Sequence, residues 1–220
     1  IPSMTGYHGL AICANGALTL DLATHEVLSA THIDPDIGLR VCELLREIDP
    51  GITFATELSR AHDNFLIDPN YETRWERHIE FPRRTVEQMF ETDAVIKLMA
   101  RPSAQTNFDS DSFLRNALSV VADLVEVTHS DLHNVLLEMS ALGVNKGTGL
   151  ERYATGIGYQ AEQVCAVGDM PNDIEMIRWS GHGAAVANAH EQVKQVADVH
   201  LPSNDEHAVA VLIHSLLDHA

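Results

Sequence analysis

The chain has 220 residues, a formal net charge of −18 at pH 7, and 45% hydrophobic against 21% charged residues. This composition is typical of a folded globular protein, and the length allows one large domain or two smaller ones. The 32 acidic residues far outnumber the 14 basic ones, so we expect neither nucleic acid nor a membrane surface as partner. A small phosphorylated ligand stays compatible with this charge, because a metal ion can invert the local potential.

The first half of the chain predicts a mixture of strands and helices. Residues 9–14 form an apolar run that ends at Asn15-Gly16, and residues 17–21 alternate as a strand does, which predicts a hairpin. Asp34-Pro35-Asp36 predicts the start of a helix that reaches Ile48. The stretch 62–82 is predicted to be rich in loops. Further strands are predicted at 52–58, 94–99, 124–128 and 134–139, and a helix from Ser110 onward.

After Gly143 the predicted helices and strands alternate strictly. Helices are expected at 146–158, 172–179, 191–197 and 206–217, and strands at 163–167, 184–187 and 198–201. Such alternation predicts an α/β fold with a Rossmann-like parallel sheet. Because the middle of the chain does not alternate, we expect an α+β domain inserted at 27–139, between core segments 1–26 and 140–220.

The three cysteines are far apart and odd in number, so they predict no disulfide framework. Small buried hydrophobic side chains are the simplest interpretation. Reduced cysteines fit a reducing compartment, and we expect a cytoplasmic protein.

The segment Val167-Gly168-Asp169-Met170-Pro171-Asn172-Asp173 carries the clearest chemical signal. Asp169 directly follows a buried strand, and ligands of open α/β sheets bind at the carboxyl ends of strands. The oxygens of Asp169, Asn172 and Asp173 are the hard donors that Mg²⁺ prefers. The simpler alternative is that Asn172 and Asp173 only cap the next helix.

Lys146 stands between small residues at a predicted helix start. A lysine there can act as a fixed positive charge for a phosphate group. The alternative is an ordinary solvated lysine. The neighbouring Gly147-Thr148-Gly149 has neither the Walker spacing nor the dinucleotide-binding spacing.

These segments together resemble the haloacid dehalogenase superfamily, and more narrowly its Cof-type phosphatases with a class II cap. The resemblance rests on Asn145-Lys146-Gly147, on Gly168-Asp169 with Asn172-Asp173, and on Ala187-Asn188-Ala189 with Val193-Lys194 and Ala197-Asp198. The turn Ala14-Asn15-Gly16-Ala17 is also similar to that subgroup's Asn-Gly-Ala turn. The match covers residues 9–30 and 138–215.

The resemblance implies Mg²⁺-dependent phosphoryl transfer on a small phosphorylated metabolite such as a sugar phosphate. Matched by position, Lys146 would neutralise the phosphate, and Asp169, Asn172 and Asp173 would hold or orient the metal. Asn15 and Asn188 would contribute to substrate or phosphate binding. The cap domain would set substrate preference.

Members of this superfamily use an Asp-x-Asp pair as nucleophile and general acid/base. Asp34-Pro35-Asp36 has this spacing but is better interpreted as a helix cap. Asp109-Ser110-Asp111 has it too, but it follows Gln-Thr-Asn-Phe rather than a hydrophobic strand, and the helix cap there is predicted at Ser110-Asp111-Ser112. Because the chain opens at Ile1 rather than Met, we expect the nucleophile to lie upstream of it. The core would then lack its first β-α-β unit, which takes roughly 30 to 40 residues.

Two alternatives stay open at this point. A phosphomutase of the same superfamily would transfer the phosphoryl group between positions of its substrate. A non-catalytic protein would keep the pocket for phosphate and metal but lack the nucleophile. The sequence predicts no oligomeric state.

Two further features, a pair of histidines and a tryptophan, have a functional and a structural interpretation. His129 and His133 have helical i, i+4 spacing, but surface histidines are the favoured interpretation over a metal site. Trp75, next to Arg74, is interpreted as a packing residue rather than a substrate contact.

Overall fold

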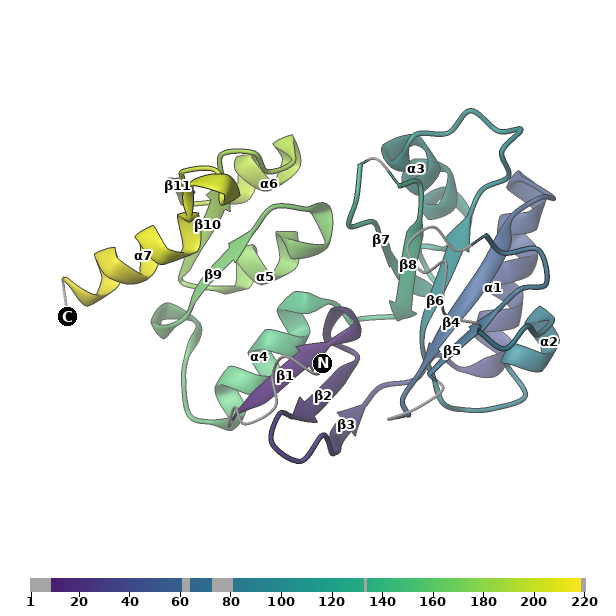
Figure 1. Ribbon diagram of the computed structural model, residues 1–220, viewed down its shortest axis with the longest axis horizontal. Coiled ribbons are helices and arrows are strands. Elements are labelled where there is room, and N and C mark those ends of the chain that lie inside the picture. Colours follow the sequence, from purple (N-terminus) through teal and green to yellow (C-terminus); the bar gives the residue numbers. More distant parts are fainter. Residues whose placement is uncertain (1–8, 61–63, 73–80, 133, 219–220) are drawn as a thin grey trace. The chain divides into compact units, whose positions relative to one another are not determined.

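The computed structural model describes residues 9–60, 64–72, 81–132 and 134–218. It divides into two compact units, residues 1–144 and residues 145–220 (Figure 1). Each unit has its own sheets and its own hydrophobic core. The predicted α/β fold with a parallel sheet is confirmed. The predicted grouping of residues 1–26 with 140–220 stays a prediction.

A small antiparallel sheet opens the first unit. It contains β1 (Leu10–Cys13), β2 (Leu18–Asp21) and β3 (Val27–Ala30). The predicted hairpin joins β1 to β2 through a short 3-10 turn, Ala14–Gly16. Asn15 has φ 54° in this turn, a left-handed conformation that asparagine tolerates better than most residues.

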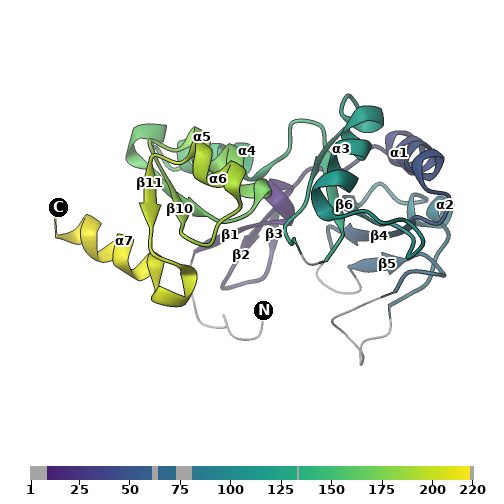
Figure 2. The ribbon, with the colours of Figure 1, turned by 90° about the horizontal axis from the view of Figure 1, so that it is seen from above.

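The larger sheet of the first unit has five antiparallel strands in the order β5-β4-β6-β8-β7 (Figure 1), and Figure 2 shows β4, β5 and β6 from a second side. They are β4 (Thr53–Leu58), β5 (Phe65–Ile67), β6 (Val95–Arg101), β7 (Val125–Thr128) and β8 (Leu137–Ala141). Its helices are α1 (Pro35–Ile48), α2 (Val86–Met89) and α3 (Ser110–Val121). The stretch 62–82, predicted to be rich in loops, contains one strand, β5, which is too short to give a periodic signal.

The two faces of this sheet differ in chemistry. Alternate residues of the central strands, such as Phe54, Leu98 and Leu137, are fully buried in one core with Leu45 of α1 and Phe113 of α3. The residues between them point to the opposite face, because successive strand side chains alternate. That opposite face carries charged side chains and a cavity, described below.

Both Asp-x-Asp segments lie at helix starts. The cap at Asp34 was predicted, whereas the second helix is capped by Asp109, one residue before the predicted cap. The Asp34 carboxylate accepts hydrogen bonds from the backbone N–H of Asp36 at 3.0 Å and of Ile37 at 3.2 Å. Asp109 accepts one from the N–H of Ser112 at 2.7 Å. Each cap contributes about 1 kcal/mol to helix stability, and this role accounts for both aspartates without catalysis.

The second unit follows the predicted alternation. Its parallel sheet has the order β11-β10-β9 and consists of β9 (Cys165–Gly168), β10 (His182–Val186) and β11 (Val199–Leu201). The helices are α4 (Lys146–Gly156), α5 (Ile174–Trp179), α6 (Glu191–Val196) and α7 (Ala208–Leu217). Three 3-10 turns lie at Ala161–Gln163 (η3), Pro171–Asp173 (η4) and Asn204–Glu206 (η5).

Several smaller expectations can be compared with the structure. All three cysteines are free. In the described part of the chain no helix has the length and apolarity needed to cross a membrane.

His129 is completely buried, with Nε2 2.9 Å from Asp111 Oδ1, so its interpretation as a surface residue is wrong. His133 and Trp75 lie outside the described residues.

Leu98→Ala tests the assignment of the core face. The side chain is fully buried in the sheet core, so its truncation should lower the free energy of unfolding by about 2–5 kcal/mol. The matched control Leu118→Ala removes a side chain that is 39% exposed on α3 and should change stability by less than about 1 kcal/mol. Urea denaturation measures both, and equal effects would contradict the assignment.

Candidate active site

Asp169 lies at the carboxyl end of β9, where the polypeptide leaves the sheet for the turn η4. Gly168 directly precedes it and has no room for a side chain. A Cβ there would lie 2.3 Å from the Cβ of Asp173, well inside van der Waals contact. Glycine at this position therefore lets Asp173 pack against the end of the strand.

The carboxylate of Asp173 connects three parts of the site. Its Oδ2 accepts hydrogen bonds from the backbone N–H of Asp169 at 2.9 Å and of Met170 at 3.1 Å. Its Oδ1 accepts one from Lys146 Nζ at 2.5 Å. The residue is only 4% exposed, and a buried carboxylate is stable when its oxygens are paired in this way.

Lys146 reaches Asp173 because α4 and α5 approach each other closely. It is the first residue of α4, whose N-cap Asn145 forms a capping box with Thr148. A Cβ on Gly147 would lie 2.6 Å from the backbone carbonyl of Glu175 in α5, so this approach also needs a glycine. The Lys146 side chain stays 32% exposed, so it is only partly shielded from solvent.

The electrostatics favour a cation beside Asp169. Burial raises the pKa of this carboxyl, and the negative charge of Asp173 raises it further, while Lys146 acts in the opposite direction. A bound cation would relieve the repulsion between the two carboxylates. Asn172, in the turn between them, adds an amide oxygen, and carboxylate and amide oxygens are the ligands that Mg²⁺ takes in proteins. The donor set therefore fits Mg²⁺.

The loop after β10 is tied to this site through the backbone. The N–H of His190 donates to the carbonyl oxygen of Asp169 at 2.8 Å. Within the loop, Asn188 Oδ1 accepts hydrogen bonds from the backbone N–H of Asn204 at 3.0 Å and from Ser203 Oγ at 3.2 Å. Its observed contacts are thus with the neighbouring loop, and its predicted role in phosphate binding stays a prediction.

Asn15 belongs to the first unit and has a different partner. Its Nδ2 donates to Glu138 Oε2 at 3.0 Å. Of the predicted site residues, the structure brings Lys146, Asp169 and Asp173 together, with Asn172 in the intervening turn. The ligand-binding role of Asn15 stays a prediction.

Sequence reasoning missed one charged cluster, formed by Glu57, Lys97 and Glu138 in the first unit. These residues are about 40 positions apart in the chain, and only the register of β4, β6 and β8 brings them together. The available signal was Lys97 itself, since a lysine inside an apolar strand needs charged partners on the adjacent strands.

The chain is similar to known proteins of one family. The sequence profile of the haloacid dehalogenase-like hydrolases matches residues 3–213. The 5-amino-6-(5-phospho-D-ribitylamino)uracil phosphatase YcsE of Bacillus subtilis (strain 168) is 40% identical over 89 residues, which is 40% of this chain and 35% of YcsE. YxeH of the same organism is 27% identical over 215 residues, which is 94% of this chain and 75% of YxeH. The chain thus spans only part of the length of these relatives.

Among solved structures, the subclass IIB sugar phosphatase BT4131 superposes with a TM-score of 0.75. The superposition covers 94% of this chain and 75% of that protein, at 20% sequence identity. Similarity at this level of identity shows that the two chains share a fold.

Gly168→Ala tests the packing of the site. The added methyl group must displace Asp173, and overpacking of this kind costs roughly 1–3 kcal/mol of stability. The control Gly156→Ala adds a methyl group at the end of α4, where no atom lies within 4 Å, and should be neutral or stabilising by up to about 1 kcal/mol. Thermal denaturation compares the two; a neutral Gly168→Ala would contradict the described packing.

Proposed function

The chain belongs to the haloacid dehalogenase-like hydrolase family, and from that premise we propose that it is a Mg²⁺-dependent phosphatase acting in the cytoplasm. Its proposed substrate is a small phosphorylated metabolite such as a sugar phosphate. The observation that carries the proposal is the connected set of Lys146, Asp173 and Asp169 at the carboxyl end of β9. The names of two relatives support it: YcsE is called a phosphatase and BT4131 a sugar phosphatase.

The carboxylates of Asp169 and Asp173 have different proposed roles. Both oxygens of Asp173 already accept hydrogen bonds, so we assign it to positioning Lys146 and the turn after β9. Asp169 and Asn172 would then be the direct Mg²⁺ ligands, and Asp173 would hold the turn that carries them without binding the ion itself. Bound there, Mg²⁺ supplies positive charge that offsets the charge of the phosphate oxygens.

Lys146 is the proposed phosphate-binding residue. An ammonium group has three hydrogen-bond donors, and one of them is used on Asp173. The remaining donors can bind phosphate oxygens while Asp173 fixes the direction of the side chain. A positive charge held in place in this way stabilises the negative charge that gathers on the phosphoryl oxygens during transfer.

We assign the nucleophile to an Asp-x-Asp pair upstream of Ile1. In the first step, a carboxylate oxygen of the first aspartate bonds to phosphorus and the phosphate ester bond breaks. The second aspartate gives its proton to the departing alcohol. In the second step, water attacks the phosphorus of the aspartyl-phosphate, its proton returns to the second aspartate, and inorganic phosphate leaves.

Phosphate release tests this function. The complete gene product should release inorganic phosphate from sugar phosphates when Mg²⁺ is present. Lys146→Met should lower kcat/KM by at least about 100-fold, since it removes a charge aimed at the transferring group. The control Arg115→Met, at an exposed position of α3, should keep the activity. Interconversion of sugar phosphate isomers without phosphate release would indicate a mutase, and binding without turnover would indicate a non-catalytic protein; either result would contradict the proposal.

Asp169→Asn tests the metal site without an activity assay. In the wild-type protein, Mg²⁺ at 100 times its Kd should stabilise the folded state by about 2.7 kcal/mol, and the variant should lose this stabilisation. Without Mg²⁺ the variant should be at least as stable as the wild type, because a neutral amide removes the repulsion with Asp173. Thermal denaturation measures both effects, with Asp205→Asn in η5 as control. An unchanged response of Asp169→Asn to Mg²⁺ would exclude Asp169 as a ligand.

A further inference from the structure

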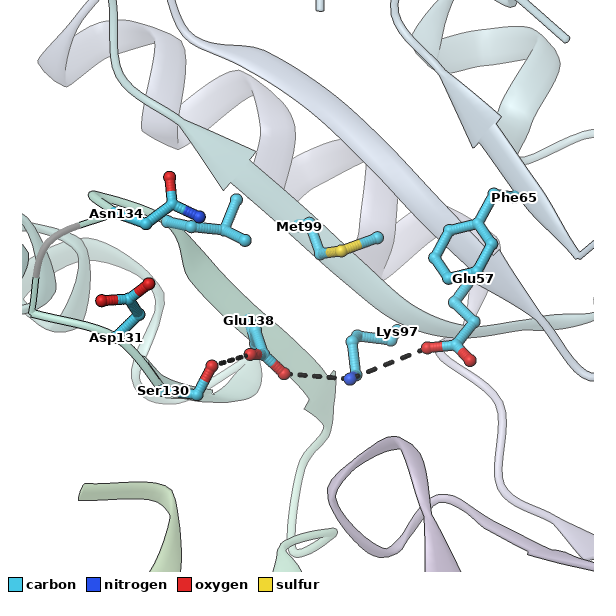
Figure 3. A pocket seen from close by; sticks show the side chains of 9 residues that line it. Glu57, Phe65, Lys97, Met99, Ser130, Asp131, Asn134 and Glu138 are labelled. Atoms are coloured by element: carbon cyan, nitrogen blue, oxygen red, sulfur yellow. Dashed lines mark hydrogen bonds and ion pairs between the residues drawn. The ribbon is translucent and has the colours of Figure 1, made fainter. Parts of the chain in front are cut away.

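A cavity of about 470 Å³ lies in the first unit, on the face of the five-stranded sheet opposite to the helical core (Figure 3). This volume is in the range of small-molecule binding sites. The side chains around it come from β4, β5, β6, β8 and the loop before β8. They are Glu57, Phe65, Lys97, Met99, Ser130, Asp131, Asn134, Leu136 and Glu138.

Three charged side chains form one wall of the cavity. Lys97 Nζ lies 2.9 Å from Glu138 Oε2 and 3.7 Å from Glu57 Oε2. Glu57 and Lys97 are directly opposite each other on β4 and β6. All three side chains are between 12% and 18% exposed, so they are largely desolvated but still border the cavity. Figure 3 shows Glu138, Lys97 and Glu57 in one row, with dashed lines for the two ion pairs.

The two carboxylates are held differently. Glu138 accepts hydrogen bonds from Asn15 Nδ2 and Ser130 Oγ in addition to its ion pair with Lys97. Glu57 lies beyond hydrogen-bond distance of Lys97, at 3.7 Å. Burial raises the pKa of Glu57, and the charge of Glu138 adds to this effect against the opposing effect of Lys97. Glu57 is therefore the less well compensated carboxylate, and a hydroxyl donor from a ligand would stabilise it.

The charge of the wall limits what can bind there. Glu57 and Glu138 carry two negative charges against the single positive charge of Lys97, and Asp131 adds a further carboxylate to the lining. A ligand with a carboxylate or a second phosphate would meet net repulsion. A hydroxyl group can donate a hydrogen bond to a carboxylate or accept one from an ammonium group. It can therefore bind the glutamates of the wall as well as Lys97.

The rest of the lining suits the carbon skeleton of such a ligand. Phe65 and Met99 border the cavity with apolar surface, as Leu136 does. The side chain of Asn134 offers both a donor and an acceptor. Apolar surface beside a few convergent polar groups is the usual composition of a pocket that fixes the orientation of a small molecule.

We propose that this cavity binds an uncharged polyhydroxylated group and discriminates against groups that carry an additional negative charge. Hydroxyl groups of the ligand donate to Glu57 and accept from Lys97, while its C–H surface packs against Phe65 and Met99. Asn15 is then a positioning residue that holds Glu138. The inference rests on the proposed function in one respect, since the polyhydroxylated group is taken to be the non-phosphate part of the substrate.

A pair of phosphate-free probes tests the proposal. Sorbitol and gluconate share a six-carbon polyhydroxylated chain and differ in having a hydroxymethyl or a carboxylate group at one end. Ligand-observed NMR titration of the complete gene product should show saturable binding of sorbitol, and at least about tenfold weaker binding of gluconate. The ratio of the gluconate Kd to the sorbitol Kd measures this discrimination. In Glu57→Gln the ratio should fall at least about threefold, because the variant removes one negative charge and keeps the shape of the side chain.

Two further variants make the result specific. Glu43→Gln makes the same chemical change on the exposed face of α1 and should leave both affinities unchanged. Asp131→Asn, at an exposed lining residue, should move the ratio in the same direction as Glu57→Gln, and serves if that variant does not fold. Absence of sorbitol binding, equal or tighter binding of gluconate, or a ratio that neither pocket variant changes would overturn the inference. Because no probe contains phosphate, such a result would not bear on the phosphatase proposal, which the phosphate-release assay tests separately.

Discussion

The second unit depends on the satisfaction of one buried carboxylate, that of Asp173. A charged group away from water is tolerated only when its oxygens are paired, and here two backbone N–H groups and the ammonium group of Lys146 do this. The arrangement explains the surrounding sequence. Gly168 leaves space for Asp173, and Gly147 lets α4 come close enough for Lys146 to reach it. The same contacts place the backbone of Asp169 at the end of β9.

The pairing of Asp173 also determines the charges around Asp169. Burial and the neighbouring carboxylate of Asp173 raise the pKa of Asp169, and Lys146 acts in the opposite direction. The protein as a whole carries a formal charge of −18, so a phosphate group approaching it needs local positive charge. In the proposed function Lys146 supplies one such charge and Mg²⁺ the other. The sheet of the first unit carries the same ratio, two carboxylates around one ammonium group, but no metal ion is proposed there. Such a surface suits uncharged hydroxyl groups.

The sequence predicts best where local pattern and local chemistry coincide. The alternation of helices and strands after Gly143 is strict, and the second unit has the predicted order of elements. Asp34 was recognisable as a helix cap because a cap depends only on its immediate neighbours. The proximity of Lys146 to Asp169 was inferred from family resemblance, since nothing local in the sequence brings residues 23 positions apart together.

What the sequence could not predict depends on tertiary contacts. The burial of His129 against Asp111 follows from the packing of α3 on the sheet and leaves no periodic signal. The wall of Glu57, Lys97 and Glu138 requires the register of three strands that are distant in the chain. The positioning role of Asp173 is visible only once both of its oxygens are seen to be occupied.

The central claim is that Asp169 and Lys146 belong to one site for a metal ion and a phosphate group. Isothermal titration calorimetry of the complete gene product with inorganic phosphate, in the presence and absence of Mg²⁺, tests it most directly. Ligands that share a site are thermodynamically coupled. The account predicts that Mg²⁺ tightens phosphate binding by at least about fivefold, and that phosphate tightens Mg²⁺ binding by the same factor. Phosphate affinity that is identical with and without Mg²⁺ would contradict it.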